Sequence, residues 1–114
     1  MHELGLVFAL SDLLEQVAAE QDLSRICRVT VELGEVSGVV AEQLQDAWGW
    51  ASQKSDLLRG CQLELREVPA VTVCNACGRT YATVPQGRMC PHCGSPDTQL
   101  LRGNEFEVIE VEGM

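Results

Sequence analysis

Four of the six cysteines occur in two pairs, and their spacing is the strongest chemical signal in the chain. In the stretch CNACGRTYATVPQGRMCPHCG, two C-x2-C pairs are separated by twelve residues. Each pair can present two thiolates from one tight turn, and a β-hairpin can bring two such turns together into a tetrahedron of sulfurs. The pattern predicts a structural zinc site whose ligands are Cys74, Cys77, Cys90 and Cys93.

Two other uses of these cysteines are less favoured than zinc. A thioredoxin-like redox pair requires a βαβ setting, which this segment lacks. A rubredoxin-like iron centre suits the stretch CPHCG, but nothing else in the chain suggests electron transfer. A closed all-thiolate site is the usual pattern of structural zinc, so zinc is preferred. His92, inside the second pair, is expected beside the metal or in solvent rather than on the metal.

The first three residues form a second candidate site. The α-amino group of Met1, the imidazole of His2, the carboxylate of Glu3 and the intervening amide nitrogens make a compact donor set. Ni(II) favours planar sets of nitrogen and oxygen donors. A simpler interpretation competes, in which the segment is a frayed terminus and Glu3 favours the positive end of a helix dipole. On three residues alone, the simpler interpretation is preferred.

Composition narrows the class of protein. The 114 residues include 17 acidic and 8 basic side chains, giving a net charge of -9, and this sign argues against nucleic acid as a main partner. No apolar run approaches the ~18 residues of a membrane-spanning helix, and the N-terminus lacks the features of a signal peptide. We therefore expect a cytoplasmic protein without membrane insertion, in which cysteines serve metal binding and burial rather than disulfides.

The periodicity of apolar residues predicts the elements that must position these sites. An α-β-α-β order is predicted by the stretches ELGLVFALSDLLEQVAAEQ, RICRVTVELG, VVAEQLQDAWGWASQ and CQLELREV. The first helix has an apolar face formed by Val7, Leu10, Leu14, Val17 and Ala18, and the second by Val40, Leu44, Ala47, Trp48 and Ala51. Ser37 is the expected cap of the second helix.

The remaining cysteines and tryptophans are expected to serve packing. Cys27 and Cys61 fall on the apolar phase of their strands, so both are predicted to be buried. Trp48 and Trp50 are two residues apart on a helix and cannot share a face, so one should be in the core and the other partly exposed.

The C-terminal stretch NEFEVIEVE is predicted to be a strand that returns to the sheet of the first half. The alternation of apolar residues places Phe106 and Val108 on one face of this strand but Ile109 and Val111 on the other. This change of face predicts a bulge or a strand covered on both faces. The cysteine-rich segment before it has too few apolar residues for a core of its own. We therefore expect an α+β fold with a two-helix, three-stranded domain (1–69 plus 104–114) and an inserted zinc-ribbon-like β lobe (70–103).

Taken together, these motifs resemble one known family. The N-terminal MHEL leading into an amphipathic helix, the stretch VELGEVSGV, the double C-x2-C insertion with CPHCG, and the closing IEVE are similar to the HypA/HybF family of nickel metallochaperones for [NiFe]-hydrogenase maturation. The similarity extends over essentially the whole chain. It implies transferable nickel bound at His2, with Glu3 as a further ligand, and structural zinc on the four paired cysteines. The α-amino group of Met1 is a candidate ligand from the donor chemistry described above.

The resemblance also implies partners and a role. A HypB-type GTPase and the hydrogenase large-subunit precursor are the implied partners, and some members of the family also serve urease. Some relatives carry an acidic residue after the first strand, for which Glu42 is a candidate substitute here. The chain shows no catalytic triad and no phosphate-binding loop, so we expect a carrier and not an enzyme. The alternative is a zinc-ribbon adaptor that binds protein partners without a transferable metal.

Overall fold

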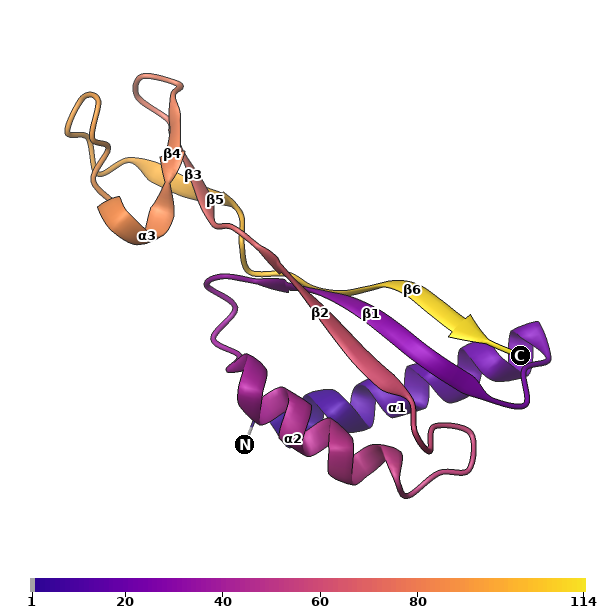
Figure 1. Cartoon of the computed structure of the whole chain (residues 1–114). Helices are drawn as coiled ribbons and strands as arrows, with labels where there is room; N and C mark the ends of the chain where they lie inside the picture. The colour runs from indigo at the N-terminus through magenta and orange to yellow at the C-terminus, as the bar shows by residue number, and fades with distance from the viewer. Residues whose placement is uncertain (1) are drawn as a thin grey trace. The chain divides into compact units, whose positions relative to one another are not determined.

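The computed structural model describes residues 2–114, with side chains described from Glu3 onward, and it has a mixed α+β fold as expected (Figure 1). The predicted α-β-α-β order of the first half is confirmed. The elements are α1 (His2–Gln21), β1 (Ile26–Gly34), α2 (Ala41–Ser52), β2 (Gln62–Val68), β3 (Val71–Cys74), β4 (Thr80–Ala82), α3 (Thr83–Gln86), β5 (Thr98–Arg102) and β6 (Phe106–Gly113).

The strands form two sheets of three strands each. The first sheet has the order β2-β1-β6, so the C-terminal strand returns to the sheet of the first half as predicted. The second sheet has the order β4-β3-β5 and is built from the cysteine-rich segment. Because β1 is the central strand of the first sheet, both of its edges are paired, whereas β2 and β6 are edge strands.

Two compact units divide the chain. Unit 1 contains the N-terminal segment through Val31, together with Val39–Arg66 and Val108–Met114; unit 2 contains Glu32–Gly38 and Glu67–Glu107. The domain division at 1–69 plus 104–114 and 70–103 stays a prediction. Among the helices of residues 2–114, none is long and apolar enough to cross a membrane.

The core of unit 1 lies where the helical spacing predicts it. In α1, which packs against α2, Val7, Leu10, Leu14 and Ala18 are buried. The buried face of α2 consists of Leu44, Ala47, Trp48, Ala51 and Ser52. Trp48 is 2% exposed and Trp50 is 52% exposed, which confirms the prediction of one core and one surface tryptophan.

The start of α2 differs from the prediction. Its N-cap is Val40, which has extended backbone dihedral angles and makes no side-chain capping hydrogen bond. Ser37 instead lies in the preceding turn, where its amide donates a hydrogen bond to the carbonyl of Gly34 at 3.1 Å. Because the helix begins at Ala41, Val40 lies outside the packed face and is 49% exposed rather than buried.

The burial of Cys27 was also wrongly predicted, whereas that of Cys61 is confirmed. Cys27 is only partly buried, while Ile26 beside it is fully buried. The buried residues of β1 therefore begin with Ile26 and continue from Val29, and Cys27 is not among them. Thr30 on the opposite phase is also buried, so the central strand is less clearly alternating than its sequence suggests.

The strand β6 is not covered on both faces. Phe106, Val108 and Val111 are partly buried, while Ile109 is 41% exposed. An edge strand has a neighbour on one side only, and its apolar residues are accordingly less enclosed than those of β1. The acidic residues of this strand are exposed.

Unit 2 contains little apolar packing. Its buried hydrophobic cluster consists of Cys74, Tyr81 and Cys90, two of which belong to the paired cysteines. The β3–β4 hairpin aligns Val73 with Thr80, and β5 pairs with the other edge of β3 after an irregularity at Val71 and Thr72. Apolar burial in this cluster is therefore small.

Candidate metal centre

The first cysteine pair sits on the turn of the β3–β4 hairpin. Cys74 is the last residue of β3, and its amide donates to the carbonyl of Arg79 at 2.9 Å. The chain between them turns tightly, because the amide of Gly78 donates back to the carbonyl of Cys74 at 2.8 Å. Gly78 has a φ of 78°, a conformation that favours glycine. The turn thus presents Cys74 and Cys77 on one side.

The second pair repeats this geometry in a separate loop. The amide of Gly94 donates to the carbonyl of Cys90 at 2.8 Å, and Gly94 has a φ of 75°. The amide of Cys90 donates to the carbonyl of Ser95 at 3.1 Å, closing the loop. The glycine that follows each pair therefore has a positive φ.

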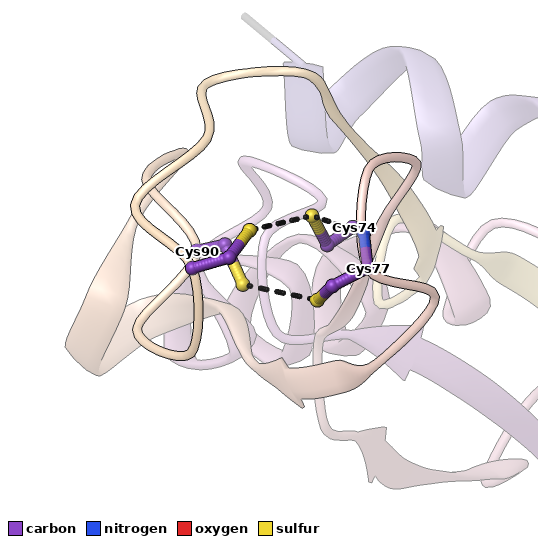
Figure 2. A group of neighbouring side chains, drawn as sticks. Cys74, Cys77 and Cys90 are labelled. Atoms are coloured by element: carbon purple, nitrogen blue, oxygen red, sulfur yellow. Dashed lines mark hydrogen bonds between the residues drawn. The ribbon is translucent and has the colours of Figure 1, made fainter.

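The two turns face each other with all four thiols together (Figure 2). The Sγ atoms of Cys74 and Cys93 are 3.5 Å apart, and those of Cys77 and Cys90 are 3.7 Å apart. All four sulfurs lie within 4.8 Å of one another, and none of the four cysteines is in a disulfide. In a tetrahedron with Zn–S bonds of ~2.3 Å, the sulfurs lie ~3.8 Å apart. The cluster therefore fits zinc.

Hydrogen bonds from backbone amides stabilise negative charge on these sulfurs. The amide of Cys77 donates to the Sγ of Cys74 at 3.4 Å, and the amide of His92 donates to the Sγ of Cys90 at 3.4 Å. Burial opposes ionisation of Cys90, but hydrogen bonds from the amides of Cys93 and His92 and from the Cys77 thiol together lower its pKa to about 6. Thiolate, the form that binds metal, is thereby favoured at Cys90.

Crowding of the thiols has the opposite effect on Cys93. Although the amide of Ser95 favours the thiolate, contact with the Cys74 thiol, burial and the thiols of Cys90 and Cys77 raise the pKa of Cys93 to about 12. Four thiolates cannot coexist at this spacing without a cation between them. A dication removes that conflict, which is a further reason why the donor set suits a metal.

His92 does not belong to the donor group. Its side chain is exposed, and the contact with Cys90 is made by its backbone amide. The metal-binding group found among the described residues consists of the four cysteines alone.

The candidate nickel ligands are only partly described. Met1 lies outside the described residues, and of His2 the structure describes only its place as the first residue of α1. Glu3 lies in the first turn of α1 and is 5% exposed, so its carboxylate side chain is held in the fold rather than solvated. Glu42 is exposed in the first turn of α2. No metal-binding cluster of described residues includes either of these carboxylates.

The burial of Glu3 was missed by the sequence interpretation, which treated it as a residue at a helix dipole. The signal was present in the spacing. Glu3 precedes Val7 by four residues and therefore shares the face on which Val7, Leu10 and Leu14 are buried. Charged residues are rarely buried, so a glutamate on the buried face of a helix indicates a specific role more strongly than a glutamate at a solvated helix end.

Comparison with known proteins gives a consistent result over the whole chain. The family described as "Hydrogenase/urease nickel incorporation, metallochaperone, hypA" matches residues 1–113. A hydrogenase maturation factor HypA from Chloroflexus aggregans is 33% identical over 114 residues, covering 98% of each chain. The hydrogenase maturation factor HypA of Deinococcus radiodurans is 36% identical over 108 residues, covering 95% of this chain and 89% of the relative.

Solved structures show the same fold. The solution structure of the Ni metallochaperone HypA from Helicobacter pylori matches with a TM-score of 0.74 and 22% identity, covering 98% of this chain and 97% of the other. A solution structure described as HypA protein matches with a TM-score of 0.77 and 23% identity, covering 100% of this chain and 97% of the other.

Proposed function

The chain belongs to the HypA family of nickel metallochaperones for hydrogenase maturation, which are not enzymes, and we propose that it binds Ni(II) at its N-terminus and delivers it to a [NiFe]-hydrogenase precursor. The observation that carries this proposal is the match to that family over residues 1–113. A carrier needs a site from which the ion can leave again. A short open set of donors at a chain end meets this need better than an enclosed site.

The proposed nickel ligands are His2, with the α-amino group of Met1 and the carboxylate of Glu3 beside it. Nickel is the cargo, and a planar set of amine, imidazole and amide nitrogens suits Ni(II). Glu3 follows His2 directly in the chain, which supports the binding of one ion by both residues. Glu42 and His92 are not assigned to the nickel site.

The proposed zinc ligands are Cys74, Cys77, Cys90 and Cys93, and the role of zinc is structural. When bound, zinc would cross-link the two turns and supply folding free energy to the lobe. The support for this role is the small apolar cluster of the lobe, in which two of three members are themselves cysteines of the metal group. A closed set of four thiolates also leaves no position for exchange of an additional ligand.

The family assignment supports a proposal for the partners, and the sequence supports one for the domain roles. We propose that a HypB-type GTPase assists delivery and that the recipient is the hydrogenase large-subunit precursor, in the cytoplasm. The nickel-binding function is assigned to a domain of residues 1–69 plus 104–114, and the zinc-binding function to residues 70–103. The family description names urease as well as hydrogenase, so the recipient enzyme is to be identified by experiment.

Metal analysis of the untagged protein tests whether one metal is transferable and the other is not. The protein is exposed to nickel and zinc, treated with a mild chelator, and then analysed for both metals. We expect one zinc per chain before and after chelation, and one nickel per chain that the chelator removes. A protein that holds zinc and never takes up nickel would support the zinc-ribbon adaptor instead, and redox-active iron would support an electron carrier.

A further inference from the structure

The outer edge of β2 displays peptide groups that no strand pairs with. Successive residues of a strand direct their N–H and C=O groups to opposite edges. The indole nitrogen of Trp48 donates to the carbonyl of Cys61 at 2.9 Å, and the side-chain amide of Gln45 donates to the carbonyl of Leu63 at 2.7 Å. Both donors come from α2, so these carbonyls point away from β1, the one strand beside β2. By alternation, the N–H and C=O of Leu65 point the same way.

A groove runs along this edge between β2 and α2. One part of it has a volume of about 620 Å³ and is bounded by residues that include Gln45, Ser52 and Leu63. The next part, of about 430 Å³, is bounded by Ala41, Glu42, Gln45, Asp46 and Leu65. Gln45 borders both parts and, through its hydrogen bond to the carbonyl of Leu63, lies between them; all of the lining residues belong to unit 1.

The charge of the groove differs between its two parts. Arg28 borders the larger part, but it is paired with Glu112 at 2.7 Å and with Glu64 at 3.7 Å. Glu42 and Asp46 border the smaller part beside Leu65, both are exposed, and neither forms an ion pair with a described residue. The smaller part therefore carries two carboxylates that are not neutralised, in a chain with a net charge of -9.

We propose that this groove binds an extended basic segment of a partner protein, which adds to the β2 edge at Leu65 and places a lysine or arginine against Glu42 and Asp46. Strand addition supplies main-chain hydrogen bonds, and the side chains beside the edge select the sequence. Leu65 lies on the same face of β2 as the buried Leu63, so a partner residue opposite Leu65 directs its side chain toward α2. The described residues of this surface include neither the paired cysteines nor Glu3.

Amide chemical shifts of the zinc-loaded full chain, titrated with two synthetic peptides, test this proposal. One is acetyl-Thr-Lys-Thr-Lys-Thr-amide, and the other has glutamate in place of both lysines. We expect the lysine peptide to shift the amides of Leu63 and Leu65, and the glutamate peptide to leave them unchanged. Equal effects of the two peptides, or shifts confined to the other edge strand β6, would overturn the proposal.

Two pairs of variants separate edge pairing from charge. Leu65→Pro removes the outward N–H without affecting the pairing with β1, and should abolish the shifts, whereas Leu65→Ala keeps the N–H and should retain them. Asp46→Lys should weaken binding by at least fivefold, while Glu15→Lys, the same charge change on exposed α1, should change it less than twofold. Equal weakening by both charge variants would show a non-specific effect.

Concentration-dependent broadening at Leu65 without peptide would identify a second copy of the chain as the occupant and contradict the proposal.

Discussion

Each cysteine of the metal group depends on its neighbours for both position and charge. Cys74 and Cys90 are buried, while Cys77 and Cys93 are exposed, so the two turns each contribute one enclosed and one accessible sulfur. The amide hydrogen bonds to sulfur come from residues of the same turns, so a change in turn conformation removes them as well. The positions of the four sulfurs and their ionisation are therefore determined by the same few residues.

Cys77→Ser should release zinc and unfold the lobe locally. Three thiolates bind zinc much less tightly than four, and apparent binding free energies of zinc modules are ~10–16 kcal/mol, far more than the small cluster of Cys74, Tyr81 and Cys90 contributes. Amide hydrogen exchange should show lost protection in β3, β4 and β5, with protection kept in α1 and α2. Cys27→Ser, at a half-buried cysteine outside the group, serves as the control. If the Cys77 variant kept one zinc and a protected lobe, the zinc assignment would be wrong.

Cys61 should make the stability of unit 1 depend on alkaline pH. Burial, with a smaller contribution from the Cys27 thiol, raises the pKa of Cys61 from 9.0 to about 11. The folded state therefore favours the neutral thiol. Its contribution is complete below pH 9.0 and declines as pH rises toward 11, because the unfolded chain ionises first.

The matched variant for this effect is Cys61→Ala. Its free energy of unfolding should differ from that of the wild type by a constant amount below pH 9.0, and the wild type should lose stability relative to it as pH approaches 11. Denaturant unfolding at several pH values measures both. A difference that stays constant across the whole range would show that the thiol of Cys61 titrates normally.

At the scale of elements, unit 2 depends on a close approach of chain segments at Gly103. Gly103 has a φ of 119°, and an added Cβ would collide with the backbone of Ala70. The same crossing includes hydrogen bonds from the amide of Val36 to the carbonyl of Gly103 at 2.7 Å and from the amide of Gly34 to the carbonyl of Glu105 at 2.8 Å. A backbone crossing of this kind leaves no space for side chains.

Gly103→Ala should therefore be strongly destabilising. The unfavourable φ and the collision together should cost at least ~2 kcal/mol, measured by thermal or denaturant unfolding. Gly49→Ala is the control, because Gly49 lies inside α2 with nothing near its Cβ position, and the substitution should stabilise the helix by ~1 kcal/mol. A Gly103 variant as stable as the wild type would show that the crossing can relax.

The proposed domain division makes a prediction about β6. Truncation after Gly103 leaves every candidate zinc ligand in place but removes the strand that pairs with one edge of β1. The exposed edge and the lost contacts of Val108 and Val111 should lower the melting temperature of the helical domain by several degrees, while zinc content stays at one per chain. An unchanged melting transition of that domain would show that the C-terminal strand does not belong to it.

Across the whole molecule, regular periodicity and cysteine spacing predicted the features that depend on local pattern. The helical face of Val7, Leu10 and Leu14 and the turns at Gly78 and Gly94 follow from residue types at fixed intervals. These features need no knowledge of which neighbour covers which surface. They were therefore accessible without a structure.

The errors lie where burial depends on a neighbour. Whether Cys27 is enclosed depends on how the inward phase of β1 begins at Ile26, and the exposure of Ile109 follows from the edge position of β6. Ser37 is not the cap of α2 because it lies in the preceding turn, three residues before Val40, which is the N-cap. Tertiary context decides each of these cases, and a single sequence does not contain it.

Calorimetric titration of Ni(II) into zinc-loaded, untagged protein measures whether His2 holds the nickel ion. The chain has two histidines, which makes His92→Ala a matched control for His2→Ala. We predict that the wild type and His92→Ala bind one nickel with the same affinity, that His2→Ala loses at least a hundredfold in affinity, and that all three keep one zinc. Tight nickel binding by His2→Ala would contradict the N-terminal nickel site and, with it, this account of how the chain carries its metal.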